Sequence, residues 1–138
     1  MTRVLGIDPG TKRCGVAVTN TERTMAFPRP ALVRDHTLLT RLAQLVDEEA
    51  IATIVLGRPV ALSGKETSST YDADELYQEV LTRFSVVEVV QCDERLTTLE
   101  AQKSLSRAGH KARDHRERVD SAAAVIMLQN YLDGLNAE

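Results

Sequence analysis

The chain has 138 residues, of which 43% are hydrophobic and 27% are charged, and its formal net charge is −3. This length and this composition indicate one globular domain over residues 1–138 with a single core, and they exclude a disordered or fibrous protein. No stretch approaches about 18 consecutive apolar residues and no signal peptide is present, so we expect no membrane association and a cytoplasmic location.

The first part of the chain predicts three strands. Residues 3–8 and 13–19 have strand composition and are joined by a tight turn, in which proline fixes φ and glycine tolerates a positive φ. A third strand over 25–33 contains Pro28 and Pro30, which cannot donate to a sheet ladder. This strand is therefore expected at an edge of the sheet.

The middle of the chain alternates helices with strands. Asp35 can cap a helix over 36–50, whose apolar side chains recur on one face. Residues 51–56 are almost all apolar, which is typical of a strand buried on both faces. A loop and a helix over about 70–84 follow.

The last part of the chain predicts one more strand and two helices. The strand covers 86–90. A capping box at 97–100 begins a short helix that ends near Gly109, and a second capping box at 114–117 begins a final helix that ends near Asp133.

The resulting element order is βββαβαβαα. Three sequential strands in a meander, followed by strands that enter in parallel through helices, predict a mixed five-stranded α/β sheet flanked by helices. Its expected strand order is 3-2-1-4-5, which is that of the ribonuclease H-like fold.

Three acidic residues are expected near one end of this sheet. Asp8 ends the first strand, Glu94 follows the fifth, and Asp120 begins an otherwise apolar stripe of the last helix. A turn residue and a helix N-terminal acid are the simpler interpretations of Asp8 and Asp120. Ligands of α/β sheets bind at the carboxyl ends of parallel strands, and a buried acid needs a partner. Together the three acids favour an oxygen-rich site for Mg²⁺ or Mn²⁺, and two such ions can support phosphodiester hydrolysis.

A basic segment lies just before Asp120. Residues 107–118 contain Arg107, His110, Lys111, Arg113, His115, Arg116 and Arg118, whereas residues 66–79 contain acids and no base. This asymmetry favours contact with a nucleic-acid backbone, although a solvated helix face would give the same pattern. The chain has no Trp and few aromatic residues, which does not support a stacking platform for single strands.

Four segments in the same order resemble the YqgF/RuvX family. They are 6–17 (GIDPGTKRCGVA), 57–59 (GRP), 93–98 (DERLTT) and 119–132, which contains VDSAA and LQNYL. Members of this family are ribonuclease H-fold nucleases, described as Holliday-junction-resolvase-like and as processing the 5′ end of pre-16S ribosomal RNA. The resemblance runs from end to end and implies that Asp8, Glu94 and Asp120 are the metal-binding catalytic acids.

The resemblance also implies phosphate contacts within these motifs. The candidate nucleic-acid-binding residues are Lys12, Arg13, Arg58 and Arg95, together with Lys111, Arg113, Arg116 and Arg118 of the basic segment. Residues 61–64 (ALSG) depart from the polar-acidic Asn-x-Asp-Gly that is more frequent in the family, which leaves the role of this loop open.

Two other functions fit less of the sequence. The segment 6–11 also resembles the first phosphate loop of sugar kinases and chaperone ATPases, but 138 residues leave no room for a second lobe and no Walker motif is present. A nucleic-acid- or ribosome-binding module without catalysis would gain nothing from acids clustered near phosphates. We therefore expect a Mg²⁺- or Mn²⁺-dependent nuclease acting on structured RNA or branched DNA. The choice between RNA and DNA, and between monomer and homodimer, stays open.

The two cysteines lack the spacing of zinc ligands. Cys14 lies on the second strand and Cys92 near the fifth, so the strand order separates them by roughly 14 Å at about 4.8 Å per strand. Because a disulfide requires Cα atoms within about 7 Å, both are expected to be reduced thiols.

Overall fold

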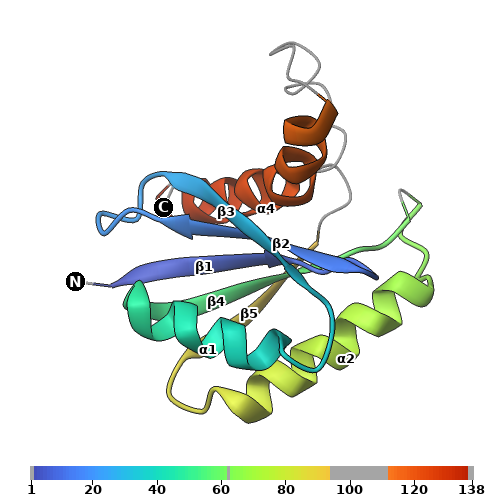
Figure 1. Ribbon diagram of the computed structural model, residues 1–138, viewed down its shortest axis with the longest axis horizontal. Helices are drawn as coiled ribbons and strands as arrows, with labels where there is room; N and C mark the ends of the chain where they lie inside the picture. The colour runs from blue at the N-terminus through green and yellow to red at the C-terminus, as the bar shows by residue number, and fades with distance from the viewer. Residues whose placement is uncertain (1, 62, 94–111, 137–138) are drawn as a thin grey trace.

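The computed structural model describes residues 2–61, 63–93 and 112–136, with backbone alone at 112–120 and at Asn136. A five-stranded sheet in the order β3-β2-β1-β4-β5 forms its centre. Helices α1 and α2 lie on one face of this sheet and α4 lies on the other (Figure 1). No helix in the described part of the chain is long and apolar enough to cross a membrane.

The strands and helices follow the predicted order. The strands are β1 (Arg3–Asp8), β2 (Arg13–Thr19), β3 (Ala26–Val33), β4 (Ile51–Arg58) and β5 (Glu88–Asp93), and the helices are α1 (Leu38–Glu48), α2 (Ser68–Arg83) and α4 (Ala112–Asn136). The β1–β2 and β2–β3 pairs are antiparallel, whereas the β1–β4 and β4–β5 pairs are parallel. The predicted strand order 3-2-1-4-5 is therefore confirmed. The short helix predicted between 97 and 109 lies outside the described residues.

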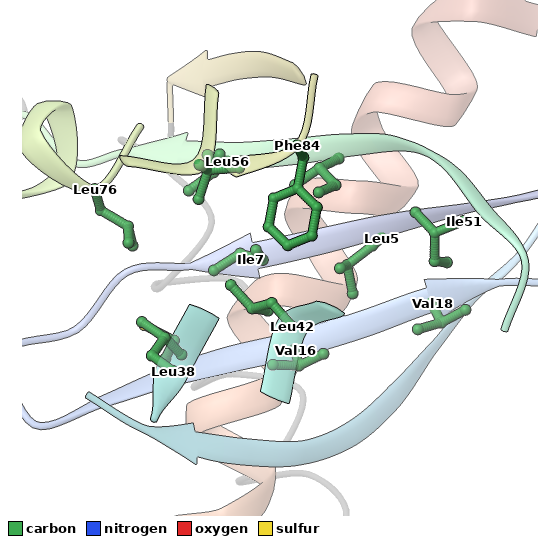
Figure 2. Close-up of a cluster of buried hydrophobic side chains, with 13 residues drawn as sticks. Leu5, Ile7, Val16, Val18, Leu38, Leu42, Ile51, Leu56, Leu76 and Phe84 are labelled. Atoms are coloured by element: carbon green, nitrogen blue, oxygen red, sulfur yellow. The ribbon is translucent and has the colours of Figure 1, made fainter. Parts of the chain in front are cut away.

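Alternating residues of the strands build two apolar layers. Leu5 and Ile7 of β1 point to the face covered by α1 and α2, where they join the cluster shown in Figure 2. Val4 belongs to the opposite layer, in which Met127 and Leu128 of α4 pack against the sheet. This period of two also assigns Gly6 and Asp8 to the α4 face. Residues 51 and 53–57 of β4 are buried, which confirms a strand covered on both sides.

Helix α4 packs closely on the sheet because β1 has a glycine beneath it. A Cβ atom added to Gly6 would lie 3.0 Å from the Cβ of Leu128, tighter than ordinary van der Waals contact. The apolar positions of the stripe predicted for this helix are also observed, since Ala124 and Met127 are buried and Tyr131 is partly buried.

Several boundaries differ from the predictions. Helix α1 begins at Leu38 with Thr37 as its N-cap, and Asp35 instead accepts hydrogen bonds from the backbone and hydroxyl of Thr37, in a turn before the helix. The capping box of α2 is formed by Thr67 and Thr70. A capping box is usually recognised in a sequence by Glu or Gln at the third helical position, and threonine at that position gives no such signal.

The ends of the parallel strands also extend further than predicted. β4 continues to Arg58 and β5 to Asp93, because these residues pair with each other. Helix α4 begins at Ala112, so the capping box expected from 114 lies inside the helix.

Candidate active site

The carboxyl ends of the parallel strands meet at one edge of the sheet. Asp8 is the last residue of β1, and the preceding Ile7 pairs with Leu56 of β4. Further along the same direction, Arg58 of β4 pairs with Asp93, the last residue of β5. This edge is where α/β sheets bind ligands. The residue after Asp93 is Glu94, which lies outside the described part of the chain.

Asp8 is half-buried on the α4 side of this edge. The position beside Asp8 on β4 is occupied by Gly57, which carries no side chain. Gly57 pairs with Cys92 of β5, which packs against the apolar layer beneath α4. A carboxylate fixed at a strand end keeps its direction because the sheet is stiff. It therefore suits a ligand with a demanding geometry.

The course of α4 carries Asp120 toward the same edge. Gln129 of α4 donates to the carbonyl of Thr24 and accepts from the backbone of Ala26, at the start of β3. The hydroxyl of Ser121 donates to the carbonyl of Arg29 at 2.6 Å, further along β3. Arg29 of β3 pairs with Val16 of β2, which in turn pairs with Ile7 of β1, so Arg29 lies in the same row of the sheet as Ile7. By the same register, Ala26 lies in the row of Val4.

Helix α4 thus runs back along the sheet, from the end that carries Asp8 to the opposite end. Asp120, the residue before Ser121, belongs to the backbone of this helix at the Asp8 end. Its side chain is not described. Among the side chains that the structure describes, no group of three His, Cys, Asp or Glu residues could hold a metal ion.

Two candidate phosphate-binding residues are close to Asp8 in the sequence and in the fold. Arg13 begins β2, two residues from Gly15, which pairs with Asp8. The alternation of β2 places Arg13 on the α4 face, and its side chain is exposed. Lys12, in the turn between the strands, is exposed as well.

Arg58 has a different environment. Its Nε donates to Asp74 at 2.9 Å and its Nη2 donates to Glu66 at 2.5 Å, on the α2 side of the sheet. Asp74 also accepts from the side chain of Gln91 on β5. Hydrogen bonds with Asp74 and then with Glu66 raise the pKa of Arg58, and hydrogen bonds from Arg58 and then from Gln91 lower the pKa of Asp74. Arg58 therefore joins β4, α2 and the loop before α2.

The remaining candidates cannot be placed by their side chains. Arg95 and Lys111 lie outside the described residues, and Arg113, Arg116 and Arg118 belong to the part of α4 described by its backbone alone.

Sequence reasoning did not identify Arg34, which contacts the turn after Asp8. Its backbone N–H donates to the carbonyl of Lys12 at 2.8 Å, and its Nη1 donates to the carbonyl of Gly10 at 3.1 Å. The guanidinium also pairs with Asp72 of α2. Nothing in the local sequence around residue 34 signals these contacts, because they depend on where α2 packs.

Comparison with known proteins identifies the family of the chain. A family model described as "RuvX: Holliday junction resolvase" matches residues 2–134. The chain belongs to the RuvX family. A relative from Mycobacterium ulcerans (strain Agy99) is 41% identical over 133 residues, covering 95% of this chain and 78% of the relative. A relative from Mycobacterium leprae (strain Br4923) is 41% identical over 137 residues, covering 98% of this chain and 74% of the relative. Both are named "Putative pre-16S rRNA nuclease".

Solved structures of resolvases share the fold of this RuvX-family chain. RuvC of T. thermophilus, solved in complex with a Holliday junction substrate, matches with a TM-score of 0.62 and 13% identity over 99% of this chain and 97% of that one. The Fowlpox virus resolvase, solved with Holliday junction DNA, matches with a TM-score of 0.56 and 10% identity over 97% of this chain and 99% of that one. At these identities the likeness concerns the fold, and it confirms the predicted ribonuclease H-like class.

Proposed function

We propose that this chain is a divalent-metal-dependent nuclease that hydrolyses phosphodiester bonds in structured nucleic acid. Membership of the RuvX family and 41% identity to named nucleases support the nuclease activity. The observation that carries the site is the position of Asp8 at the carboxyl edge of the sheet, on the face along which α4 brings Asp120 to the same end.

Asp8, Glu94 and Asp120 are the proposed metal ligands and catalytic acids. Carboxylate oxygens are the ligands that Mg²⁺ and Mn²⁺ prefer, and the half-buried Asp8 at a strand end fits such an ion. These three acids would hold a pair of ions, which would supply an activated water and neutralise charge on the scissile phosphate. The acids of the chain set the position of the ions, and the sheet edge sets the position of the acids.

Basic side chains around this edge are proposed to hold the phosphate backbone. Lys12 and Arg13 adjoin Asp8 in the β1–β2 hairpin and are exposed. The other proposed contacts are Arg58, Arg95, Lys111, Arg113, Arg116 and Arg118. Backbone contacts of this kind give affinity without reading sequence.

Precursor 16S ribosomal RNA is the proposed substrate, because the relatives at 41% identity carry that name. This substrate implies action in the cytoplasm. A four-way DNA junction is the second candidate, favoured by the family description and by the fold shared with RuvC. Cleavage of two symmetric arms of a junction would call for a homodimer, whereas RNA processing requires no such symmetry.

The test is cleavage of both substrates by one purified sample with Mg²⁺, with Mn²⁺ and with EDTA. We expect Asp8→Asn, Glu94→Gln and Asp120→Asn each to lower the rate on the order of 10³-fold or more, since metal ions supply several kcal/mol of transition-state stabilisation. Asp47→Asn, an exposed position on α1, is the matched control and should cleave like the wild-type protein.

Each outcome of this test has a definite meaning. Cleavage in EDTA would contradict metal dependence, and near wild-type rates in one acid variant would remove that residue from the site. Thermal unfolding of every variant shows whether a loss of rate comes from a loss of fold.

A further inference from the structure

The turn that follows Asp8 is fixed from the α1/α2 side of the sheet. It covers residues 9–12 and joins β1 to β2. Arg34, the residue after β3, donates from its backbone to the carbonyl of Lys12 and from its side chain to the carbonyl of Gly10. One residue thus holds two carbonyls of a four-residue turn.

Gly10 has little freedom in this turn. A Cβ atom added there would overlap the carbonyl oxygen of Arg13, so no other residue fits without moving the backbone. The N–H of Gly10 hydrogen-bonds to the sulfur of Cys14, which is fully buried. Burial raises the pKa of Cys14, and this hydrogen bond acts in the opposite direction. The N–H and the carbonyl of Gly10 therefore each have a hydrogen-bond partner, which is Cys14 for the N–H and Arg34 for the carbonyl.

Arg34 is itself held by α2. Its Nη1 and Nη2 contact the two carboxylate oxygens of Asp72, the Nη2–Oδ1 distance being 3.2 Å, and Nη2 also approaches the carbonyl of Asp72 at 3.4 Å. The Arg34 side chain is 16% exposed. A two-pronged pair of this kind fixes the plane of the guanidinium as well as its position. We call Arg34, Asp72 and the Gly10 carbonyl the Arg34 clamp.

We propose that Arg34 is a positioning residue for the nuclease site, which acts through the Gly10 carbonyl to hold the turn after Asp8 and so to aim the Asp8 carboxylate at the metal. This inference rests on the proposed function. Functional groups must be held within about 0.5 Å of their productive geometry, and Asp8 is only two residues from the clamped carbonyl. Removal of outer supports of metal ligands typically costs about 10–100-fold in metal affinity or activity.

A purely structural role for the clamp would be to tie α2 to the sheet. The Arg58–Asp74 pair already makes such a tie two residues further along α2, without touching the turn. The Arg29–Glu49 pair, with distances of 2.6 and 2.9 Å, has the same two-pronged geometry, and the carbonyl of Glu49 accepts from Arg3 at the start of β1. Glu49→Gln is therefore a matched control, because it removes an arginine–carboxylate pair whose guanidinium also donates to the carbonyl of Pro28 rather than to the turn after Asp8.

The experiment compares Arg34→Gln, Asp72→Asn, Arg34→Lys and Glu49→Gln with the wild-type protein. We expect Arg34→Gln and Asp72→Asn to lower kcat about tenfold and to raise the Mn²⁺ concentration for half-maximal activity about tenfold. KM for the nucleic acid should stay within about twofold, because the substrate contacts are intact. Arg34→Lys keeps the charge but cannot reach both Asp72 and Gly10 as a fork, so it should rescue in part. Glu49→Gln should behave like the wild-type protein.

A second measurement reports on the turn without using activity. In a Cys92→Ser background, Cys14 is the single thiol of the chain. Its rate of reaction with a disulfide reagent under native conditions should rise in Arg34→Gln and Asp72→Asn, because loosening the turn exposes the buried sulfur next to Gly10. The rate should not rise in Glu49→Gln.

The outcomes separate the two proposals. An inactive wild-type protein would contradict the proposed function. An active wild-type protein with clamp variants equal to Glu49→Gln in kcat and Mn²⁺ requirement would contradict the positioning role alone, even if Cys14 reacted faster. Lower kcat with unchanged Mn²⁺ requirement and unchanged Cys14 reactivity would contradict it too.

Discussion

Two aspartates of α2 each pair with an arginine, and the two pairs hold different parts of the molecule. Asp72 contacts Arg34 and the turn after Asp8, whereas Asp74 contacts Arg58 and Gln91 at the ends of β4 and β5. Two positions apart on one helix, they support neighbouring parts of the same sheet edge. Arg58 therefore has a structural partner in addition to the phosphate contact proposed for it.

The Asp74 pair predicts a pH-dependent stability. The pKa of Asp74 is below its ordinary value of 3.8, first because of the Arg58 hydrogen bonds and second because of Gln91. A lowered pKa in the folded state gives a stabilisation that is present above pH 3.8 and is lost as the pH falls through the folded-state value. We expect Asp74→Asn to lower the unfolding midpoint at pH 7 and the difference from wild type to shrink below about pH 4. Thermal unfolding of both proteins between pH 7 and pH 2.5 measures this. A difference that stays constant over the whole range would contradict it.

At the scale of the elements, the sequence predicts best where a pattern is local. β1 and β2 occupy their predicted residues, because strand composition and a proline–glycine turn are both local signals. The sequence predicts the start of α2 near residue 70 rather than at Ser68, since the capping box of this helix uses Thr70 rather than an acid. The sequence predicts that β4 and β5 end at residues 56 and 90. Both strands extend further because Arg58 and Asp93 pair with each other, which no local pattern encodes.

The first turns of α4 carry a prediction about binding. They include Arg113, Arg116 and Arg118, at the end of α4 that runs toward the edge with Asp8. Replacing these three arginines with Ala should weaken nucleic-acid binding about equally for all sequences, since phosphate contacts do not read bases. The slope of log K against log salt should become shallower by roughly 2 to 3, at about 0.7–0.9 per lost phosphate contact.

Fluorescence anisotropy at several KCl concentrations measures this slope. Arg41→Ala with Arg83→Ala is the control, because these exposed arginines lie on α1 and α2, across the sheet from α4. An unchanged slope in the triple variant would identify the segment as solvated surface.

The sheet, taken as a whole, explains which features of the molecule could be inferred in advance. Element order determined the strand order, and strand order placed Asp8 and the ends of β4 and β5 at one edge. The Arg34–Asp72 contact could not be inferred in this way. It depends on how α2 packs on the sheet, and the residues are far apart in the sequence.

The two cysteines test this arrangement of the whole molecule. Cys14 faces the layer covered by α1 and α2, whereas Cys92 packs against the layer of α4, and β1 and β4 lie between their strands. Neither forms a disulfide in the described structure, in agreement with the prediction from sequence. A bond between them would require Cα atoms within about 7 Å and would break the sheet. We expect thiol titration of denatured protein, purified without reductant, to find both thiols. Loss of both in a protein that still migrates as a monomer on a non-reducing gel would contradict the strand order and, with it, the placement of Asp8 at the edge shared by β4 and β5.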